Sequence, residues 1–181
     1  MALKEKALRR LAEKLNAAGI TWGIGASWLL CFHGVMDTYH DFDLMAAEAD
    51  AAQADKVLTR LGMRSPAADA GDAFHCAYHF DGADVELMAG AVIGGQYHMR
   101  FDASSIAGTA EVLGAQVPLM HLEDWYVYYA LMGRDSRTAA LERYFAAHPP
   151  AHPERFALAV AEPLPASLQA KIDEMMGACQ Q

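Results

Sequence analysis

Hydrophobic residues recur at helical spacing at the start of the chain and at strand spacing through its middle. Leu8, Leu11 and Leu15 predict a helix that closes at Gly19, because glycine readily adopts the left-handed conformation that ends helices. Alternation and turn residues then predict strands at 20–24, 41–44, 74–80 and 83–91, with helices at 27–32 and 51–61. This order of elements indicates an α/β or α+β sheet with helices on one side.

The second half of the chain changes from strands to helices. A strand pair is expected near 96–101 and 115–120, and prolines then separate four helical segments. We therefore expect an α/β domain over 1–118 and a C-terminal helical region over 119–181 that packs on it. The four predicted helices cover 122–132, 137–147, 153–160 and 166–176.

Composition narrows the classes of partner. The 181 residues are 54% hydrophobic, which is enough for a compact core, and carry a formal net charge of -9 without a basic run. Because nucleic-acid phosphates attract clustered cations, we expect a small-molecule or protein partner and no nucleic acid. We also expect no membrane partner, since the sequence has neither a secretory signal nor an apolar stretch of spanning length. Three widely spaced cysteines favour a reducing compartment, and we place the protein in the cytoplasm.

Two pairs of acids carry the candidate chemistry. Asp41 and Asp43 stand two apart on a predicted strand, so both side chains leave the same face. Two neighbouring carboxylates repel each other unless a cation bridges them, and their oxygens suit a hard ion such as Mg²⁺. Asp84 and Glu86 repeat this spacing on a later strand. If the two strands are adjacent, one of these later acids completes the cluster, and we expect it to be Glu86.

A second feature lies upstream, where Ile24-Gly25-Ala26-Ser27 connects a predicted strand to a predicted helix. Such a turn presents backbone N–H groups to an anion, so a phosphate could bind there. Gly25 could equally be a glycine that only permits close packing. A phosphate-accepting turn followed by strand carboxylates is the arrangement that metal-assisted phosphoryl chemistry requires.

These motifs resemble the small nucleotidyltransferases of the polymerase β superfamily, which include lincosamide and aminoglycoside resistance enzymes. The resemblance spans roughly residues 20–135. It rests on Trp22-Gly-Ile-Gly-Ala-Ser, on His40-Asp-Phe-Asp-Leu44, on Val85-Glu-Leu-Met88 and on Leu122-Glu-Asp-Trp125.

The resemblance implies a nucleotidyltransferase-like mixed sheet flanked by helices, and an enzyme that moves a nucleoside monophosphate from a nucleoside triphosphate to a small hydroxylated acceptor. It implies that Asp41, Asp43 and Glu86 bind magnesium, with two ions expected, and that Glu86 serves as a metal ligand or general base. It also implies that the triphosphate, for instance ATP, is held by Gly25, Ser27, Arg134 and Arg137.

Other interpretations remain beside this one. Ala26, Asp37 and Glu86 depart from the usual pattern of the family, so the alternative is a catalytically silent module that binds a nucleotide or a protein partner, as in a toxin and antitoxin pair. A second subunit that completes the cleft, as in a homodimer, is compatible with so short a chain. The acids at 123 and 124 are expected to be structural, since acids favour the first turn of a helix.

Overall fold

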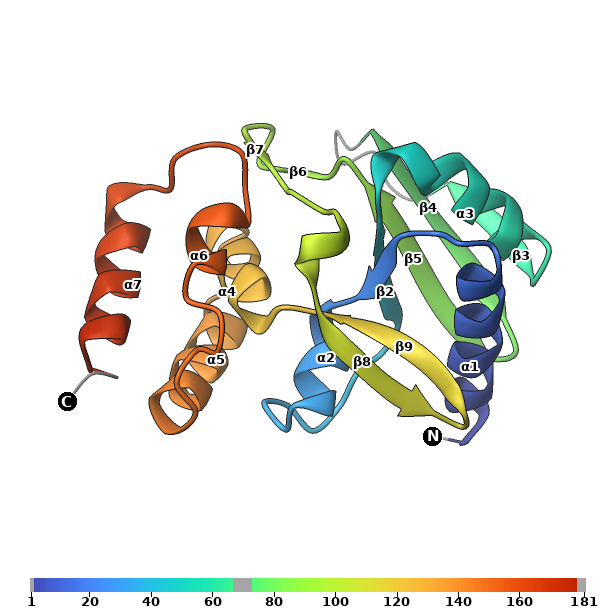
Figure 1. Cartoon of the computed structure of the whole chain (residues 1–181), viewed down its shortest axis with the longest axis horizontal. Helices are drawn as coiled ribbons and strands as arrows, with labels where there is room; N and C mark the ends of the chain where they lie inside the picture. Colours follow the sequence, from blue (N-terminus) through green and yellow to red (C-terminus); the bar gives the residue numbers. More distant parts are fainter. Residues whose placement is uncertain (1, 67–72, 179–181) are drawn as a thin grey trace.

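A mixed sheet of seven strands organises the first two thirds of the chain in the computed structural model, which describes residues 2–66 and 73–178 (Figure 1). Neighbouring strands follow the order β3-β4-β5-β2-β1-β9-β8. Because β2 pairs in parallel with β5 and antiparallel with β1, it lies inside the sheet with a neighbour on each side. The strands are β1 (Trp22–Ile24), β2 (Phe42–Ala46), β3 (Met63–Pro66), β4 (Phe74–Phe80), β5 (Ala83–Ala89), β8 (Ile106–Val112) and β9 (Ala115–Met120).

The helices predicted in the first part of the chain are confirmed. Helix α1 (Ala2–Ala17) contacts β9 and α3 (Ala51–Thr59), while α2 (Ala26–Phe32) contacts β2. Leu8, Leu11 and Leu15 of α1 are completely buried, as their spacing predicts. Gly19 follows α1 with a φ of 68°, the left-handed conformation expected of a residue that ends a helix.

The β4–β5 hairpin has the turn that the sequence indicates. Asp81 and Gly82 connect the two strands with φ angles of 51° and 73°, and two successive positive values match the twist of a tight hairpin. Each strand alternates buried and more exposed residues along its length. The hairpin therefore gives β5 one face toward the core and one face on which polar side chains can lie.

One strand pair was predicted incorrectly. The partner of β9 is β8 and not the segment 96–101, which contains only β7 (Tyr97–His98), paired with β6 (Val92–Ile93) in a separate ribbon. Most β8 side chains are exposed or half-buried on the edge of the sheet, so its sequence lacks the hydrophobic alternation of an inner strand. The short edge strand β3 was missed as well.

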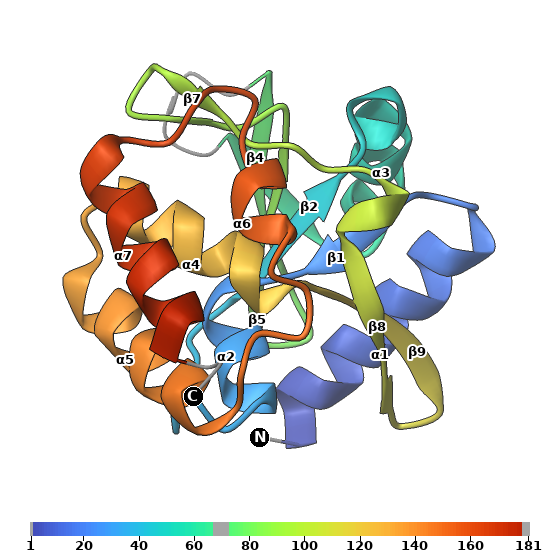
Figure 2. The ribbon, with the colours of Figure 1, turned by 60° about the vertical axis from the view of Figure 1, so that its left-hand side comes forward.

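The C-terminal helices lie together beside the sheet (Figures 1 and 2). Helix α4 (Leu122–Leu131) packs against α5 (Asp135–Ala147), α6 (Arg155–Leu158) and α2, and α7 (Ala166–Ala178) packs against α5. The predicted helical segments are confirmed, with shifted ends. No helix within 2–66 or 73–178 combines the length and apolar character that crossing a bilayer requires.

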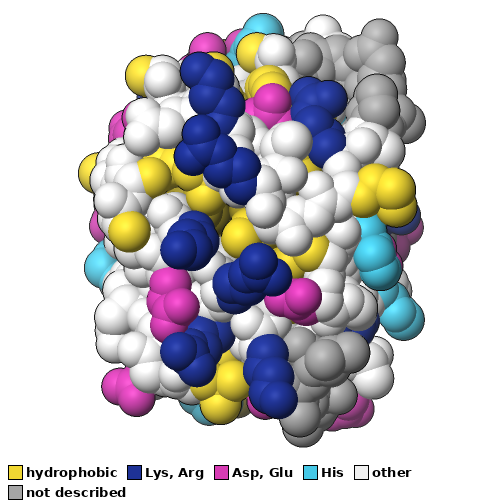
Figure 3. Space-filling model, turned by 90° about the vertical axis from the view of Figure 1, so that its right-hand side faces the viewer, with side chains coloured by type: hydrophobic (Ala, Val, Ile, Leu, Met, Phe, Trp, Pro, Cys, Tyr) yellow, Lys and Arg dark blue, Asp and Glu magenta, His cyan; other side chains and the backbone are white. Residues whose placement is uncertain are grey.

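Charge is distributed unevenly over this fold. Figure 3 shows Lys and Arg side chains gathered on the face formed by α1 and α3, although the whole chain has a net charge of -9. Of the 14 Lys and Arg residues, eight lie in α1, in α3 or between α3 and Arg64. They are Lys4, Lys6, Arg9, Arg10, Lys14, Lys56, Arg60 and Arg64.

Candidate functional site

Five of the seven predicted site residues line a cavity of about 760 Å³ between the sheet and the α4–α5 pair, whereas Gly25 and Ser27 lie outside its lining. Side chains from β2 and β5 line one part of it, and the end of α4 and the start of α5 line another. A stretch around β6 and residue 99 completes the lining. Its polar lining residues include Asp41, Asp43, His75, Glu86, Tyr129, Arg134 and Arg137.

The three acids converge because of strand register. Asp43 of β2 pairs with Glu86 of β5 in the parallel ladder, so both side chains leave the same face of adjacent strands. Phe42 and Leu44 on either side of Asp43 are completely buried on the opposite face. Asp41 lies one residue before β2 and lines the same cavity. The expected adjacency of the two strands is confirmed. Glu86 lines the cavity, whereas Asp84 is exposed and lies outside the lining, and the role of Glu86 as a metal ligand stays a prediction.

Burial and the neighbouring carboxylates shift the pKa of Asp43. Burial, followed by the negative charges of Asp41 and Glu86, raises the pKa of Asp43 from 3.8 to about 7. The guanidinium of Arg137 acts in the opposite direction but does not offset them. Near neutral pH, a large fraction of Asp43 therefore holds its proton, and a cation bound among the three acids would displace it.

Divalent metal binding at this cluster stays a prediction. Within the described ranges, no three or more His, Cys, Asp or Glu side chains are placed such that they could hold a metal ion as they stand. The chemistry of the donor set nevertheless fits a hard cation, since three carboxylates line one cavity and burial, with the charges of the other two acids, raises the pKa of Asp43.

The turn between β1 and α2 is packed tightly. The Gly25 N–H donates a 2.9 Å hydrogen bond to the Asp43 carbonyl, and a Cβ atom on Gly25 would overlap the indole of Trp125. Close packing therefore explains this glycine by itself. Ala26 has a φ of 46°, a conformation that L-residues with a Cβ rarely adopt, and it lines the cavity. Ser27 is buried, and its hydroxyl has no hydrogen-bond partner among the described residues.

Two arginines line the same cavity as the acids. Arg137 of α5 donates a 3.0 Å hydrogen bond to the Tyr129 hydroxyl, and its guanidinium lies 5.2 Å from the centre of the Tyr129 ring. This pairing fixes the guanidinium at the wall of the cavity. Arg134 precedes α5 and is exposed. The cavity therefore has two arginines in the same lining as its three acids, and Arg137 is close enough to lower the pKa of Asp43.

Sequence reasoning missed several lining residues. One of them is His75, whose Nε2 lies 3.2 Å from Glu86 Oε2 across the β4–β5 hairpin. The register of the hairpin could have indicated this contact, because Ala77 stands opposite Glu86 and His75 is its neighbour on the same face. The apolar lining residue Met99 was missed because it falls in the segment 96–101, where the strand prediction was wrong, and Val92 was missed because it lies between the predicted strands.

The acids at the start of α4 are structural, although the helix dipole is not their main partner. Arg155 donates two hydrogen bonds to the Asp124 carboxylate, of 3.0 and 2.7 Å, and both residues are buried. Burial raises the pKa of Asp124 to about 6 even though Arg155 lowers it. Glu123 accepts a 2.9 Å hydrogen bond from the His152 backbone N–H. These contacts join α4 to the segment that contains α6.

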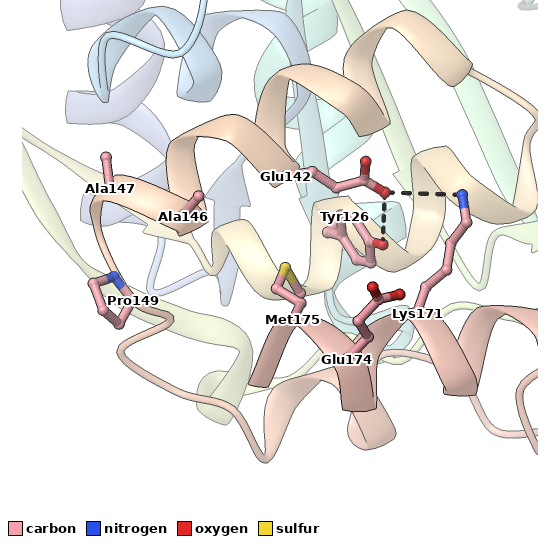
Figure 4. A pocket seen from close by; sticks show the side chains of 8 residues that line it. All are labelled: Tyr126, Glu142, Ala146, Ala147, Pro149, Lys171, Glu174 and Met175. Carbon is pink, nitrogen blue, oxygen red and sulfur yellow. Dashed lines mark hydrogen bonds and ion pairs between the residues drawn. The ribbon is translucent and has the colours of Figure 1, made fainter. Parts of the chain in front are cut away.

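A second cavity, of about 610 Å³, contains none of the predicted site residues (Figure 4). It lies between α5 and α7, with Tyr126 of α4 also lining it. Its acid Glu142 already accepts a 3.1 Å hydrogen bond from the Tyr126 hydroxyl and lies 4.0 Å from the Lys171 ammonium. Because none of the predicted site residues lines this cavity, the predicted chemistry belongs to the first cavity.

The fold is that of nucleotidyltransferases. A candidate nucleotidyltransferase from Thermotoga maritima matches 79% of this chain and 92% of its own, with a TM-score of 0.60 and 19% identity. The structure of ANT(2")-Ia in complex with adenylyl-2"-tobramycin matches 98% of this chain and 97% of its own, with a TM-score of 0.53 and 14% identity. An antigenic nucleotidyltransferase-like protein from Paracoccidioides brasiliensis matches 99% of this chain and 93% of its own, with a TM-score of 0.51 and 16% identity.

Comparison by sequence adds nothing to this result, since no family model and no curated protein matches the chain. The resemblance drawn from the short motifs is therefore confirmed at the level of the fold. At these identities, the activity does not follow from the fold.

Proposed function

We propose that this protein is a magnesium-dependent nucleotidyltransferase that moves a nucleoside monophosphate from a nucleoside triphosphate to a small hydroxylated acceptor and releases pyrophosphate. The observation that carries the proposal is the convergence of Asp41, Asp43 and Glu86 at one cavity that Arg134 and Arg137 also line. A metal-bound triphosphate requires acids for the metal and cations for the phosphates in one site.

Asp41, Asp43 and Glu86 would hold the metal, with two ions expected. When bound, Mg²⁺ would neutralise triphosphate charge and lower the pKa of an acceptor hydroxyl. The raised pKa of Asp43 supports this assignment, because the cluster lacks enough positive charge of its own. Glu86 is half-buried, and as a proton acceptor for the hydroxyl it would act from the floor of the same cavity.

The two walls of the cavity would receive different parts of the substrates. Arg134 and Arg137 would bind triphosphate oxygens, because guanidinium groups pair well with phosphate. Gly25 and Ser27, at the start of α2, would contribute to triphosphate binding. The Gly25 N–H already donates a hydrogen bond to the Asp43 carbonyl, so it would not itself donate to a phosphate. Val92 and Met99 line an uncharged part of the cavity, which would face the acceptor.

A thermal-shift screen tests the proposal. Each of the four nucleoside triphosphates is added with and without Mg²⁺ to the wild-type protein and to Asp43→Asn. We expect stabilisation that requires both Mg²⁺ and Asp43, since a ligand that binds only the folded state raises the melting temperature. The absence of any shift in the wild-type protein would contradict the proposed site.

Turnover needs a separate measurement, because a silent module could still bind a nucleotide. The backbone strain at Ala26 is the structural feature that favours this alternative, since glycine would adopt the same φ of 46° without cost. Pyrophosphate release in the presence of candidate hydroxylated acceptors separates the two functions. Release that disappears in Asp43→Asn would eliminate the silent module.

A further inference from the structure

Two histidine–carboxylate pairs join strands β4 and β5. In the first, His75 Nε2 lies 3.2 Å from Glu86 Oε2. In the second, His79 Nδ1 lies 2.7 Å from Asp84 Oδ1. Both histidines project from the same strand face, since they stand four residues apart on β4.

The surroundings of the two pairs differ. The His75 side chain is 16% exposed, and both His75 and Glu86 line the cavity that holds Asp41 and Asp43. The side chains of His79 and Asp84 are 54% and 72% exposed, and neither residue lines that cavity. The chain therefore contains one His–carboxylate pair at the site and a matched pair in solvent.

Strand register explains how His75 reaches Glu86. Ala77 stands directly opposite Glu86, and His75 stands opposite Met88, so His75 and Glu86 are diagonal neighbours. Diagonal positions lie within reach of long and aromatic side chains. The small side chain of Ala77 leaves space for Glu86 to lean toward the imidazole. The contact also engages only one carboxylate oxygen, Oε2.

We propose that His75 is a positioning residue, which holds the Glu86 carboxylate in the orientation needed to bind the divalent ion at the Asp41–Asp43 cluster. The inference rests on the proposed function. A glutamate side chain has three rotatable bonds, and a hydrogen bond from an imidazole N–H restricts them before the ion arrives. Such partners of a metal ligand commonly change metal affinity about 10- to 100-fold when they are removed.

Binding of Mn²⁺ to the protein without nucleotide tests the inference, with free Mn²⁺ followed by electron paramagnetic resonance. The proteins compared are wild type, Asp43→Asn, His75→Ala, His75→Gln and His79→Ala. We expect His75→Ala to weaken Mn²⁺ binding about 10-fold or more. His75→Gln, whose amide N–H has a similar reach, should restore most of the affinity. His79→Ala should bind Mn²⁺ as the wild type does.

Each outcome separates this inference from the proposed function. If the wild-type protein binds Mn²⁺ and Asp43→Asn does not, but His75→Ala binds it with wild-type affinity, the role of His75 is refuted and the metal site stands. An equal loss in His79→Ala, or no recovery in a folded His75→Gln, would also refute it. If the wild-type protein binds no Mn²⁺, the proposed metal site fails, and the role of His75 fails with it.

Discussion

Asp43 of β2 stands directly opposite Glu86 of β5 in the parallel register of the two strands. Their side chains share a cavity with Asp41, and the charges of these neighbours add to burial in raising the pKa of Asp43 to about 7. The arrangement costs stability in the metal-free protein, because three acids face one another. Replacing Asp43 with an uncharged residue is therefore predicted to stabilise the metal-free protein while it weakens binding of the metal and the triphosphate.

Asp43→Asn should stabilise the metal-free protein at pH 8 by about 1–3 kcal/mol. The folded protein holds the Asp43 proton more tightly than the unfolded chain, whose pKa is 3.8, so the wild type loses stability as the pH rises from about 4 to about 7. Asparagine carries no charge and avoids this loss. Urea denaturation in EDTA at several pH values measures the difference, which should vanish near pH 4.

The control for this experiment is Asp84→Asn, which removes an exposed acid from the neighbouring strand β5. We expect it to change stability by less than about 0.5 kcal/mol at pH 8. Equal stability of Asp43→Asn and wild type at pH 8 would contradict the electrostatic description of the cluster.

Gly25→Ala should destabilise the fold by about 2 kcal/mol or more, because the added Cβ would overlap the buried indole of Trp125. Chemical denaturation measures the loss. Gly108→Ala is the matched control, since a Cβ at Gly108 meets nothing within 4 Å. A fully stable Gly25→Ala protein that had lost only triphosphate binding would show instead that Gly25 serves the ligand and not the packing.

Arg137→Gln should weaken binding of ATP with magnesium about 10-fold, which corresponds to about 1.4 kcal/mol. The reason is that the guanidinium is held at the cavity wall by its hydrogen bond to Tyr129 and is the cation that acts on Asp43. Calorimetric titration measures the affinity. Arg143→Gln changes an exposed arginine of the same helix outside the cavity lining and should leave it unchanged.

Arg155→Met should destabilise the protein by about 3–5 kcal/mol, because it leaves the buried Asp124 carboxylate without its cation. The double variant Arg155→Met/Asp124→Leu should recover much of this loss, since no unpaired charge then remains. Thermal and urea denaturation of both variants measure the difference. A double variant no more stable than the single one would refute this explanation.

An exposed ion pair provides the comparison. Arg64 Nε lies 2.6 Å from Asp55 Oδ1, and both side chains are partly exposed to solvent. Arg64→Met should therefore cost less than about 1 kcal/mol. A loss as large as that of Arg155→Met would show that burial does not separate the two pairs.

The order of elements and most of the site could be read from local patterns. Helical spacing and Gly19 placed α1, and the turn at Asp81-Gly82 placed the β4–β5 hairpin, because these signals lie within a few residues of one another. The spacing of Asp41 and Asp43 indicated one shared face. The edge strand β8 was not predicted, because an exposed strand needs no hydrophobic alternation.

The sequence by itself determined that Asp41 and Asp43 flank a buried Phe42 and that a later strand carries Glu86, because both follow from the two-residue period of a strand. Only the tertiary structure decided that Glu86 faces Asp43, because that contact depends on the pairing of β2 with β5. It also decided that His75 contacts Glu86 and that Trp125 closes over Gly25. Such contacts join residues far apart in the chain, and sheet register and helix packing place them, so no local pattern encodes them.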